Sequence, residues 1–190
     1  MDIKIAIKES IATKTRLIEN NEVIQKIEQA VQLCIDGFNN GNKMYLCGNG
    51  GSAADAQHIA AELSGRFNYD RKPLPAEALH VNTSFLTAVA NDYDYTKVYS
   101  RMVEAFGKKG DILIGISTSG NSANVVEAMK IAKDQEMLTI GLTGENGGKL
   151  AGLSDVCIQV PSNNVARIQE SHILIGHILC EEIEKALFPK

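Results

Sequence analysis

From residue 43 onward, short apolar runs alternate with segments of helical periodicity, and this alternation most constrains the fold. The runs are apolar without a polar alternation at residues 44–47, 78–81, 112–116, 138–142 and 156–160. Strands that are buried on both faces have this composition. Helical patterns occupy the intervals between and after them, at residues 52–63, 84–90, 97–106, 123–134 and 166–187. We therefore predict an α/β domain of three layers, in which helices cover both faces of a parallel five-stranded sheet.

The first 40 residues differ from the rest and form a predicted N-terminal helical extension. Apolar residues recur every three to four positions over residues 24–38, and Gly41 stands where a helix C-terminus is expected. Residues 7–18 indicate an earlier helix, whereas the alternation at residues 3–7 would also suit a strand. Because no internal repeat or linker is present, we predict one domain over residues 1–190.

The composition is that of a globular protein and argues against several functions. Lys and Arg total 19 against 23 Asp and Glu, so the net charge of −4 offers no general surface for nucleic acid. No segment reaches membrane-spanning length and the charged start has no signal-peptide core, so we expect no membrane segment and a cytoplasmic location. The 4 cysteines form no C-x-x-C pair, as expected of reduced thiols.

The loop after the first apolar run is rich in glycine. Ligands of parallel α/β sheets bind beyond the carboxyl ends of the strands, so function is expected in such loops. Residues 48–52 read Gly-Asn-Gly-Gly-Ser, and their backbone N–H groups can approach an anion at the start of the next helix. A plain strand-to-helix turn is one alternative. A dinucleotide-binding fingerprint is another, but the acidic residue expected at the end of the next strand is missing.

The loop after the third run carries four hydroxyls in six residues, from Ser117 to Ser122. Hydroxyls and N–H groups at a helix start suit a phosphate monoester without any cation. The alternative is that Ser119 or Ser122 caps the following helix, although a cap requires only one hydroxyl. The glycine–lysine pattern of a P-loop nucleoside triphosphatase is absent, which argues against that class. The sequence therefore predicts a phosphate site in this loop.

Two predicted helices carry histidines beside acids or amides. His58 and Glu62 lie four residues apart on one face, where they can share a metal, act as acid and base, or form a surface pair. His177 interrupts an apolar segment, which indicates either a core histidine or a functional one. His172 lies on a different face and is interpreted as an interface or solvated residue. Gln169 is about 12 Å along the helix from His177, so a shared metal needs converging side chains or ligands from different subunits.

Six segments of the chain form an ordered set of motifs, at residues 48–52, 55–58, 62–66, 91–92, 115–122 and 167–170. Together they resemble the phosphoheptose isomerase family of the sugar-isomerase (SIS) fold, and the resemblance covers essentially the whole chain. It implies a flavodoxin-like SIS domain that converts sedoheptulose 7-phosphate into D-glycero-D-manno-heptopyranose 7-phosphate. That reaction is the first step of ADP- and GDP-heptose biosynthesis, which serves lipopolysaccharide and other surface glycans.

The resemblance also implies a cytoplasmic homotetramer with active sites between subunits and one zinc ion per subunit. The implied zinc ligands are His58, Glu62, Gln169 and His177. The implied acid–base pair is Glu62 and His177. The residues implied to bind the sugar phosphate are Asn49, Gly50, Gly51, Ser52, Glu62, Arg66, Asn91, Asp92, Ser117, Thr118, Ser119, Ser122 and Gln169.

The implied chemistry agrees with the residue types. Isomerisation through an enediol needs a base for the carbon proton, an acid and base for the oxygens, and exclusion of water. Glu62 is the expected base and His177 its partner, but a tight zinc ligand is not a free base, so the double role of Glu62 stays open. The chain departs from the family pattern at Ala166, where some members carry an acid, and at Ala53 and Ala54, where some are polar. These departures concern minor substrate contacts.

A relative from another functional class is the replication-initiator-associating protein, a non-enzymatic tetramer of the same fold. The chain resembles it at residues 53–54, 90–92 and 187–189. That relative lacks the equivalents of Glu62 and His177, and this chain keeps both, which favours the enzyme. A further alternative is another phosphosugar isomerase or a sugar-sensing SIS domain, because the loops recognise phosphate and hydroxyls without fixing the length of the sugar.

Overall fold

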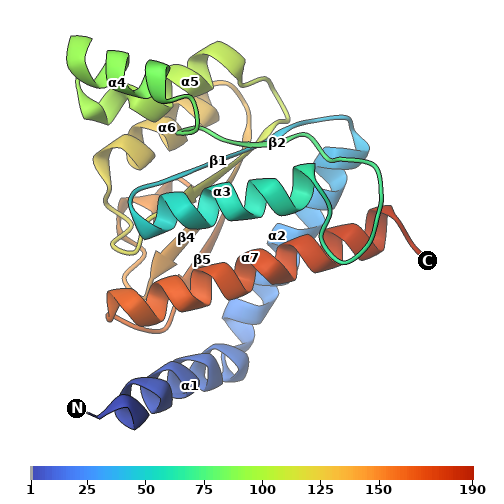
Figure 1. Cartoon of the computed structure of the whole chain (residues 1–190), viewed down its shortest axis with the longest axis vertical. Coiled ribbons are helices and arrows are strands. Elements are labelled where there is room, and N and C mark those ends of the chain that lie inside the picture. The colour runs from blue at the N-terminus through green and yellow to red at the C-terminus, as the bar shows by residue number, and fades with distance from the viewer. Residues whose placement is uncertain (1) are drawn as a thin grey trace.

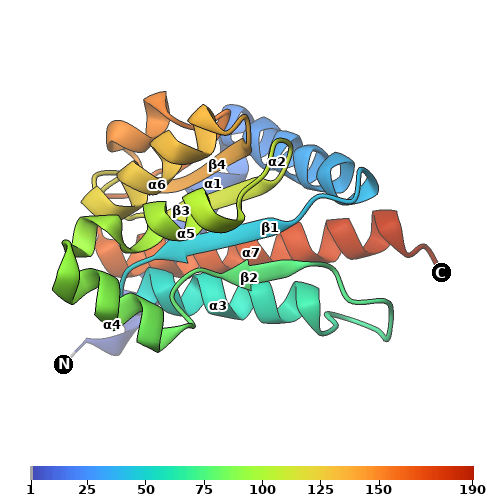
Figure 2. The ribbon, with the colours of Figure 1, turned by 90° about the horizontal axis from the view of Figure 1, so that it is seen from above.

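The computed structural model describes residues 2–190, in which a parallel sheet lies between two layers of helices (Figures 1 and 2). The strands are β1 (Met44–Gly48), β2 (Ala76–Ala78), β3 (Ile112–Ile116), β4 (Leu138–Gly144) and β5 (Val156–Val160). Their order is β2-β1-β3-β4-β5, and every neighbouring pair is parallel. The predicted α/β class and its parallel five-stranded sheet are confirmed.

Helices connect the strands and precede them. The α-helices are α1 (Ile3–Glu19), α2 (Asn21–Asn39), α3 (Gly51–Ser64), α4 (Thr83–Asp92), α5 (Val98–Phe106), α6 (Ala123–Asp134) and α7 (Val165–Leu187). Two short 3₁₀ helices are η1 (Tyr95–Lys97) and η2 (Gly148–Gly152). Within residues 2–190 no helix combines the length and the apolar character that a membrane span requires.

Alternate side chains of the strands enter two separate apolar clusters, which is why the predicted runs are apolar throughout. Met44 and Leu46 of β1 belong to the cluster packed by α2, α3 and α7. Tyr45 and Cys47 of the same strand belong to the cluster packed by α4, α5 and α6. All four of the protein's cysteines are buried and free of disulfides. Both faces of the sheet are therefore closed, and its loops are left to bind ligands.

The prediction of a strand at residues 78–81 is wrong in its position, because β2 ends at Ala78 and the next two residues form a turn. β2 lies at the edge of the sheet and is only 3 residues long, with Glu77 exposed between two buried alanines. Such a short stretch of small residues carries little apolar signal, whereas Leu79 after it is buried and apolar. The apolar run therefore marks the turn after the strand more strongly than the strand.

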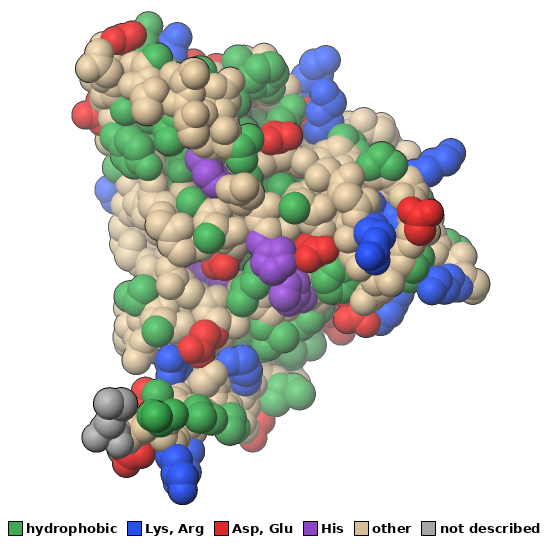
Figure 3. Space-filling model, viewed as in Figure 1, with side chains coloured by type: hydrophobic (Ala, Val, Ile, Leu, Met, Phe, Trp, Pro, Cys, Tyr) green, Lys and Arg blue, Asp and Glu red, His purple; other side chains and the backbone are tan. Residues whose placement is uncertain are grey.

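The N-terminal extension is helical, and the alternative of a strand at residues 3–7 is wrong. The side chain of Asp2 accepts a hydrogen bond from the N–H of Ile5, which caps α1. Asn20 separates α1 from α2 and caps the latter in the same way. Hydrophobic side chains gather on the N-terminal helix in Figure 3, and α1 carries large side chains that are 53–70% exposed, namely Ile3, Ile5, Ile7, Ile11 and Ile18. Because Ile3, Ile5 and Ile7 are all exposed, their alternation in the sequence does not report a buried helix face, and it suits a strand as well as a helix.

Candidate active site

The two loops predicted to hold phosphate lie beside each other, because they follow the paired strands β1 and β3. Two reciprocal hydrogen bonds join them: Asn49 donates to Asn124, and Asn124 donates to Asn49, both at 2.8 Å. Asn124 is 3% exposed and also accepts the N–H of Val125. The sequence analysis missed Asn124, whose place in the first turn of α6 opposite the glycine loop depends on the strand order.

The hydroxyl loop turns its serines toward one another. Ser117 is buried, and its Oγ lies 2.9 Å from Oγ of Ser122 and 3.4 Å from Oγ of Ser119. Ser122 stands at the N-cap position of α6 but makes no side-chain capping bond. Ser119 accepts the N–H of Asn121, which belongs to the loop and not to α6. The capping alternative therefore does not account for these hydroxyls. The N–H of Val125 is bonded to Asn124 and that of Ser122 to Ser117, whereas the N–H groups of Ala123 and Asn124 stay available to an anion.

A cavity of about 330 Å³ opens beside this loop. Thr118 and Ser119 line one side, and the segment after β4 together with the start of α7 lines the other. Gly120 closes the loop against Gly147: its φ is +65°, and a Cβ there would lie 2.0 Å from the Gly147 carbonyl oxygen. Only glycine fits this backbone position. The loop is thus held in place by close backbone packing.

The glycine loop leads into α3 without a side-chain cap. Gly50 has a φ of +57° at the N-cap position, and Ser52 behind it is buried. A Cβ on Gly51 would lie 2.6 Å from Nε2 of Gln169, so glycine here lets α7 approach the start of α3. Gln169 therefore lies at the same end of the molecule as the glycine loop.

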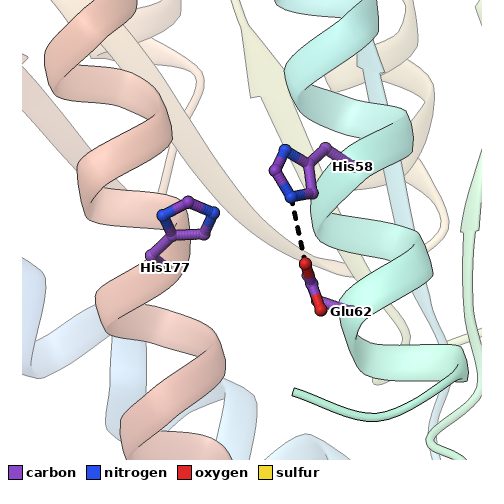
Figure 4. A group of neighbouring side chains, drawn as sticks. All are labelled: His58, Glu62 and His177. Atoms are coloured by element: carbon purple, nitrogen blue, oxygen red, sulfur yellow. Dashed lines mark hydrogen bonds and ion pairs between the residues drawn. The ribbon is translucent and has the colours of Figure 1, made fainter. Parts of the chain in front are cut away.

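His58, Glu62 and His177 meet on the surface between α3 and α7 (Figure 4). Nε2 of His58 lies 3.0 Å from Oε1 of Glu62, and the rings of His58 and His177 are 5.0 Å apart at 77°. Figure 3 shows histidine side chains gathered over these two helices beside acidic groups. The helices approach closely because a Cβ on Gly176 would lie 2.5 Å from Cδ1 of Ile59. The predicted spacing of His58 and Glu62 and the approach of α7 together produce the cluster.

The donor set of this cluster fits zinc. One atom from each of the three residues, two imidazole nitrogens and a carboxylate oxygen, lies within 4.8 Å of the others. In a tetrahedral zinc site such atoms lie roughly 3.4 Å apart, so small side-chain rotations suffice. Three protein ligands leave one position for a further ligand.

Four further predicted site residues make no hydrogen bond to the His58–Glu62–His177 cluster among the described residues. Gln169, predicted as the fourth zinc ligand, packs against Gly51 and is about two helical turns from His177. Arg66, Asn91 and Asp92 are exposed, and Asn91 donates to the carboxylate of Asp92 at 2.8 Å. The position of Gln169 therefore separates it from the His58–Glu62–His177 cluster of the same chain.

The environment of two titratable side chains differs from what the sequence predicts. His172 is fully buried and its Nε2 lies 3.1 Å from the carbonyl oxygen of Thr143, so its interpretation as a solvated or interface residue is wrong. Its place on the buried stripe of α7 is the signal that identifies it.

Asp55, one turn before His58, was not singled out in the sequence. Burial raises the pKa of its carboxyl group to about 6, against a smaller lowering effect of His58. Its Oδ2 is buried without a hydrogen-bond partner among the described residues.

The fold and the paired loops define a sugar-phosphate-binding SIS domain, and comparison with known proteins agrees. The family model described as "SIS domain" matches residues 7–144. The phosphoheptose isomerase of Aneurinibacillus thermoaerophilus is 51% identical over 186 residues, which cover 98% of this chain and 94% of that protein. The phosphoheptose isomerase of Sulfurimonas denitrificans is 52% identical, with coverage of 98% and 95%. The chain belongs to the phosphoheptose isomerase family.

Solved structures of that family have the same fold. The phosphoheptose isomerase GmhA from Neisseria gonorrhoeae superposes with a TM-score of 0.91 at 45% identity, covering 96% of this chain and 97% of that one. The phosphoheptose isomerase from Francisella tularensis gives a TM-score of 0.92 at 39% identity, with 97% of each chain covered. The resemblance drawn from the motifs is confirmed.

Proposed function

We propose that this chain converts sedoheptulose 7-phosphate into D-glycero-D-manno-heptopyranose 7-phosphate, as an aldose–ketose isomerase at the first step of ADP- or GDP-heptose biosynthesis. The observation that carries the proposal is the convergence of Glu62 and His177, because an enediol isomerisation needs a base and an acid in one place. Relatives that are about half identical over nearly the whole chain are named phosphoheptose isomerase.

Glu62 is the proposed base for the carbon proton. One of its carboxylate oxygens is bonded to His58, which orients the carboxylate, and the second makes no hydrogen bond among the described residues. His177 lies opposite Glu62, on α7, and is the proposed acid and base for the sugar oxygens. A zinc ion held by His58, Glu62 and His177 would polarise a carbonyl oxygen. A carboxylate with one oxygen engaged and one free is compatible with both roles of Glu62.

The phosphate is proposed to bind at the hydroxyl loop. Ser117, Thr118, Ser119 and Ser122 offer hydroxyl donors, and the start of α6 offers N–H groups and the positive end of the helix dipole. The glycine loop is tied to this site by the Asn49–Asn124 pair, so Asn49, Gly50, Gly51 and Ser52 are proposed to contact the sugar.

The working form is proposed to be a homotetramer with active sites between subunits. An apolar groove of about 550 Å³ lies between α1, α2 and α7. Leu17, Ile24 and Ile178 line it, and its rim carries both Lys14 and Glu182. A rim with both signs of charge suits a second copy of the same surface. A second copy would also supply the groups that one chain leaves apart, such as Gln169. The four buried free thiols support a reducing, cytoplasmic location.

The test is NMR of purified protein with sedoheptulose 7-phosphate, with and without added zinc. Appearance of an aldoheptose 7-phosphate supports the proposal. The Glu62→Gln variant should give no product while its oligomer keeps the molar mass of the wild-type oligomer. No turnover by the folded wild-type protein in either condition would refute it. The comparisons give no support to the replication-initiator alternative, which predicts binding to the initiator protein and no turnover.

A further inference from the structure

A buried ion pair holds the segment that follows α3 against α7. Nε of Arg71 lies 3.2 Å from Oε1 of Glu184, and the two side chains are 2% and 1% exposed. Figure 1 shows the loop after α3 running beside the C-terminal part of α7. Neither charged group belongs to the His58–Glu62–His177 cluster, yet Arg71 is bonded to the backbone of Glu62 and Glu184 to the backbone of the loop that follows.

Arg71 caps the C-terminal end of α3. Its guanidinium donates to the carbonyl oxygens of Glu62 at 2.8 Å, Leu63 at 2.6 Å and Gly65 at 2.9 Å. The last carbonyls of a helix lack partners within the helix, and a cation there also interacts favourably with the helix dipole. The bond to the Glu62 carbonyl fixes the backbone from which the proposed base extends.

Glu184 holds the other part of the loop. Its two carboxylate oxygens accept the N–H of Phe67 at 3.1 Å and the N–H of Asn68 at 2.8 Å. The ring of Phe67 packs on His177, with centroids 5.8 Å apart at an angle of 34°. Because His177 and Glu184 are two turns apart on α7, the carboxylate places the Phe67 ring against the imidazole that the same helix presents.

We propose that the Arg71–Glu184 pair is a positioning device that sets Glu62, through its backbone, and His177, through Phe67, for catalysis and zinc binding. The inference rests on the proposed function. Buried ion pairs are a costly way to gain stability, since apolar residues of similar volume often replace them without loss. A pair that fixes the backbone of the base and the packing of its partner has a role that apolar residues do not fill.

The test compares Arg71→Lys protein with the wild type. Lysine keeps the charge but loses the planar fork that reaches both Glu184 and the end of α3. We expect kcat to fall roughly 10- to 100-fold and zinc affinity to fall by a similar factor, as for groups that orient metal ligands. KM for the phosphosugar should change less than about twofold, because none of the hydrogen bonds of Arg71 reaches the phosphate loop. Zinc affinity is measured by competition with a chromogenic chelator, without substrate.

Tyr69→Phe is the matched control. The Tyr69 hydroxyl lies within hydrogen-bond distance of the carbonyl oxygens of Glu184 and Phe188, so it anchors the same loop at the end of α7 without touching Glu62. This variant should lose thermal stability but keep kcat and zinc affinity. Glu184→Gln removes the charge and replaces one of the two acceptor oxygens by an NH2 donor, so it loses a bond to Arg71 or to the loop backbone. It is measured in parallel, so that the test survives if Arg71→Lys does not fold.

The outcomes separate the two proposals. Arg71→Lys protein with wild-type kcat and zinc affinity would overturn the positioning role, as would equal losses in the Tyr69→Phe control. Wild-type protein that binds zinc but does not turn over sedoheptulose 7-phosphate would refute the proposed function. The loss of zinc affinity in Arg71→Lys would then still support the positioning role.

Discussion

His172 should make the folded protein less stable as the pH falls below neutrality. It is fully buried, and its Nε2 donates to the carbonyl oxygen of Thr143 at 3.1 Å, since a carbonyl only accepts. The other ring nitrogen, Nδ1, is buried and has no partner among the described residues. Protonation would therefore place an uncompensated charge in the core, and burial lowers the pKa of His172 to about 4, with a smaller opposite effect of the Thr143 carbonyl.

The sign and size of the effect follow from linkage. The ordinary pKa of histidine is 6.5, so between pH 6.5 and about 4 the unfolded chain binds a proton that the folded chain does not. The free energy of unfolding therefore decreases as the pH is lowered through this window. The total loss is roughly 3 kcal/mol, at 1.36 kcal/mol for each pKa unit. About 2 kcal/mol of this loss should lie between about pH 7.5 and about pH 5.

The assay is urea unfolding of wild-type and His172→Gln protein at these two pH values and one protein concentration. Glutamine keeps an N–H donor for the Thr143 carbonyl and does not titrate, so the variant should lose about 2 kcal/mol less than the wild type. Asp55 opposes the effect, because its raised pKa lets the folded chain bind a proton first, but it is present in both proteins and cancels. Equal losses in the two proteins would refute the reasoning.

Three further predictions concern the site. His177→Ala should lower isomerase activity and bound zinc together; unchanged zinc with lost activity would make His177 an acid–base group and not a ligand. Ser119→Ala should mainly raise KM for the phosphosugar, by roughly 5- to 10-fold for one lost hydrogen bond, and an unaffected KM in steady-state assays would place the phosphate elsewhere. Gly120→Ala should destabilise the fold by more than the roughly 1 kcal/mol of a left-handed alanine, because the new Cβ would lie 2.0 Å from the Gly147 carbonyl oxygen. Chemical denaturation tests it, and wild-type stability would contradict it.

The parts of the fold that sequence predicted best are those whose signal is local. The strand over residues 112–116 and the helix over residues 123–134 have the predicted bounds, because an unbroken apolar run meets a polar loop and then a helical period. β2 was misplaced because its neighbours decide its pairing: Met44 of β1 is paired with Ala76, a small residue without a strong pattern of its own. Edge strands of this kind depend on the rest of the sheet.

The site divides in the same way. The i, i+4 spacing of His58 and Glu62 is readable in the sequence, and so are the hydroxyls of the loop after β3. That His177 joins them depends on the packing of two helices more than 100 residues apart in sequence, and on the contact of Gly176 with Ile59. No local pattern encodes that contact.

The contact of Gly176 with Ile59 also holds α3 and α7 together, and with them the three residues of the cluster. The His58–Glu62 pair is partly exposed, at 47% and 26% of the side chains, and such a pair contributes on the order of 1 kcal/mol or less. Ile59, by contrast, is 1% exposed and fills the space that Gly176 leaves. Apolar packing therefore holds the two helices together, and the histidines and the carboxylate are brought together as a consequence. A metal bound there would add stability by mass action, because it binds the folded form of this cluster.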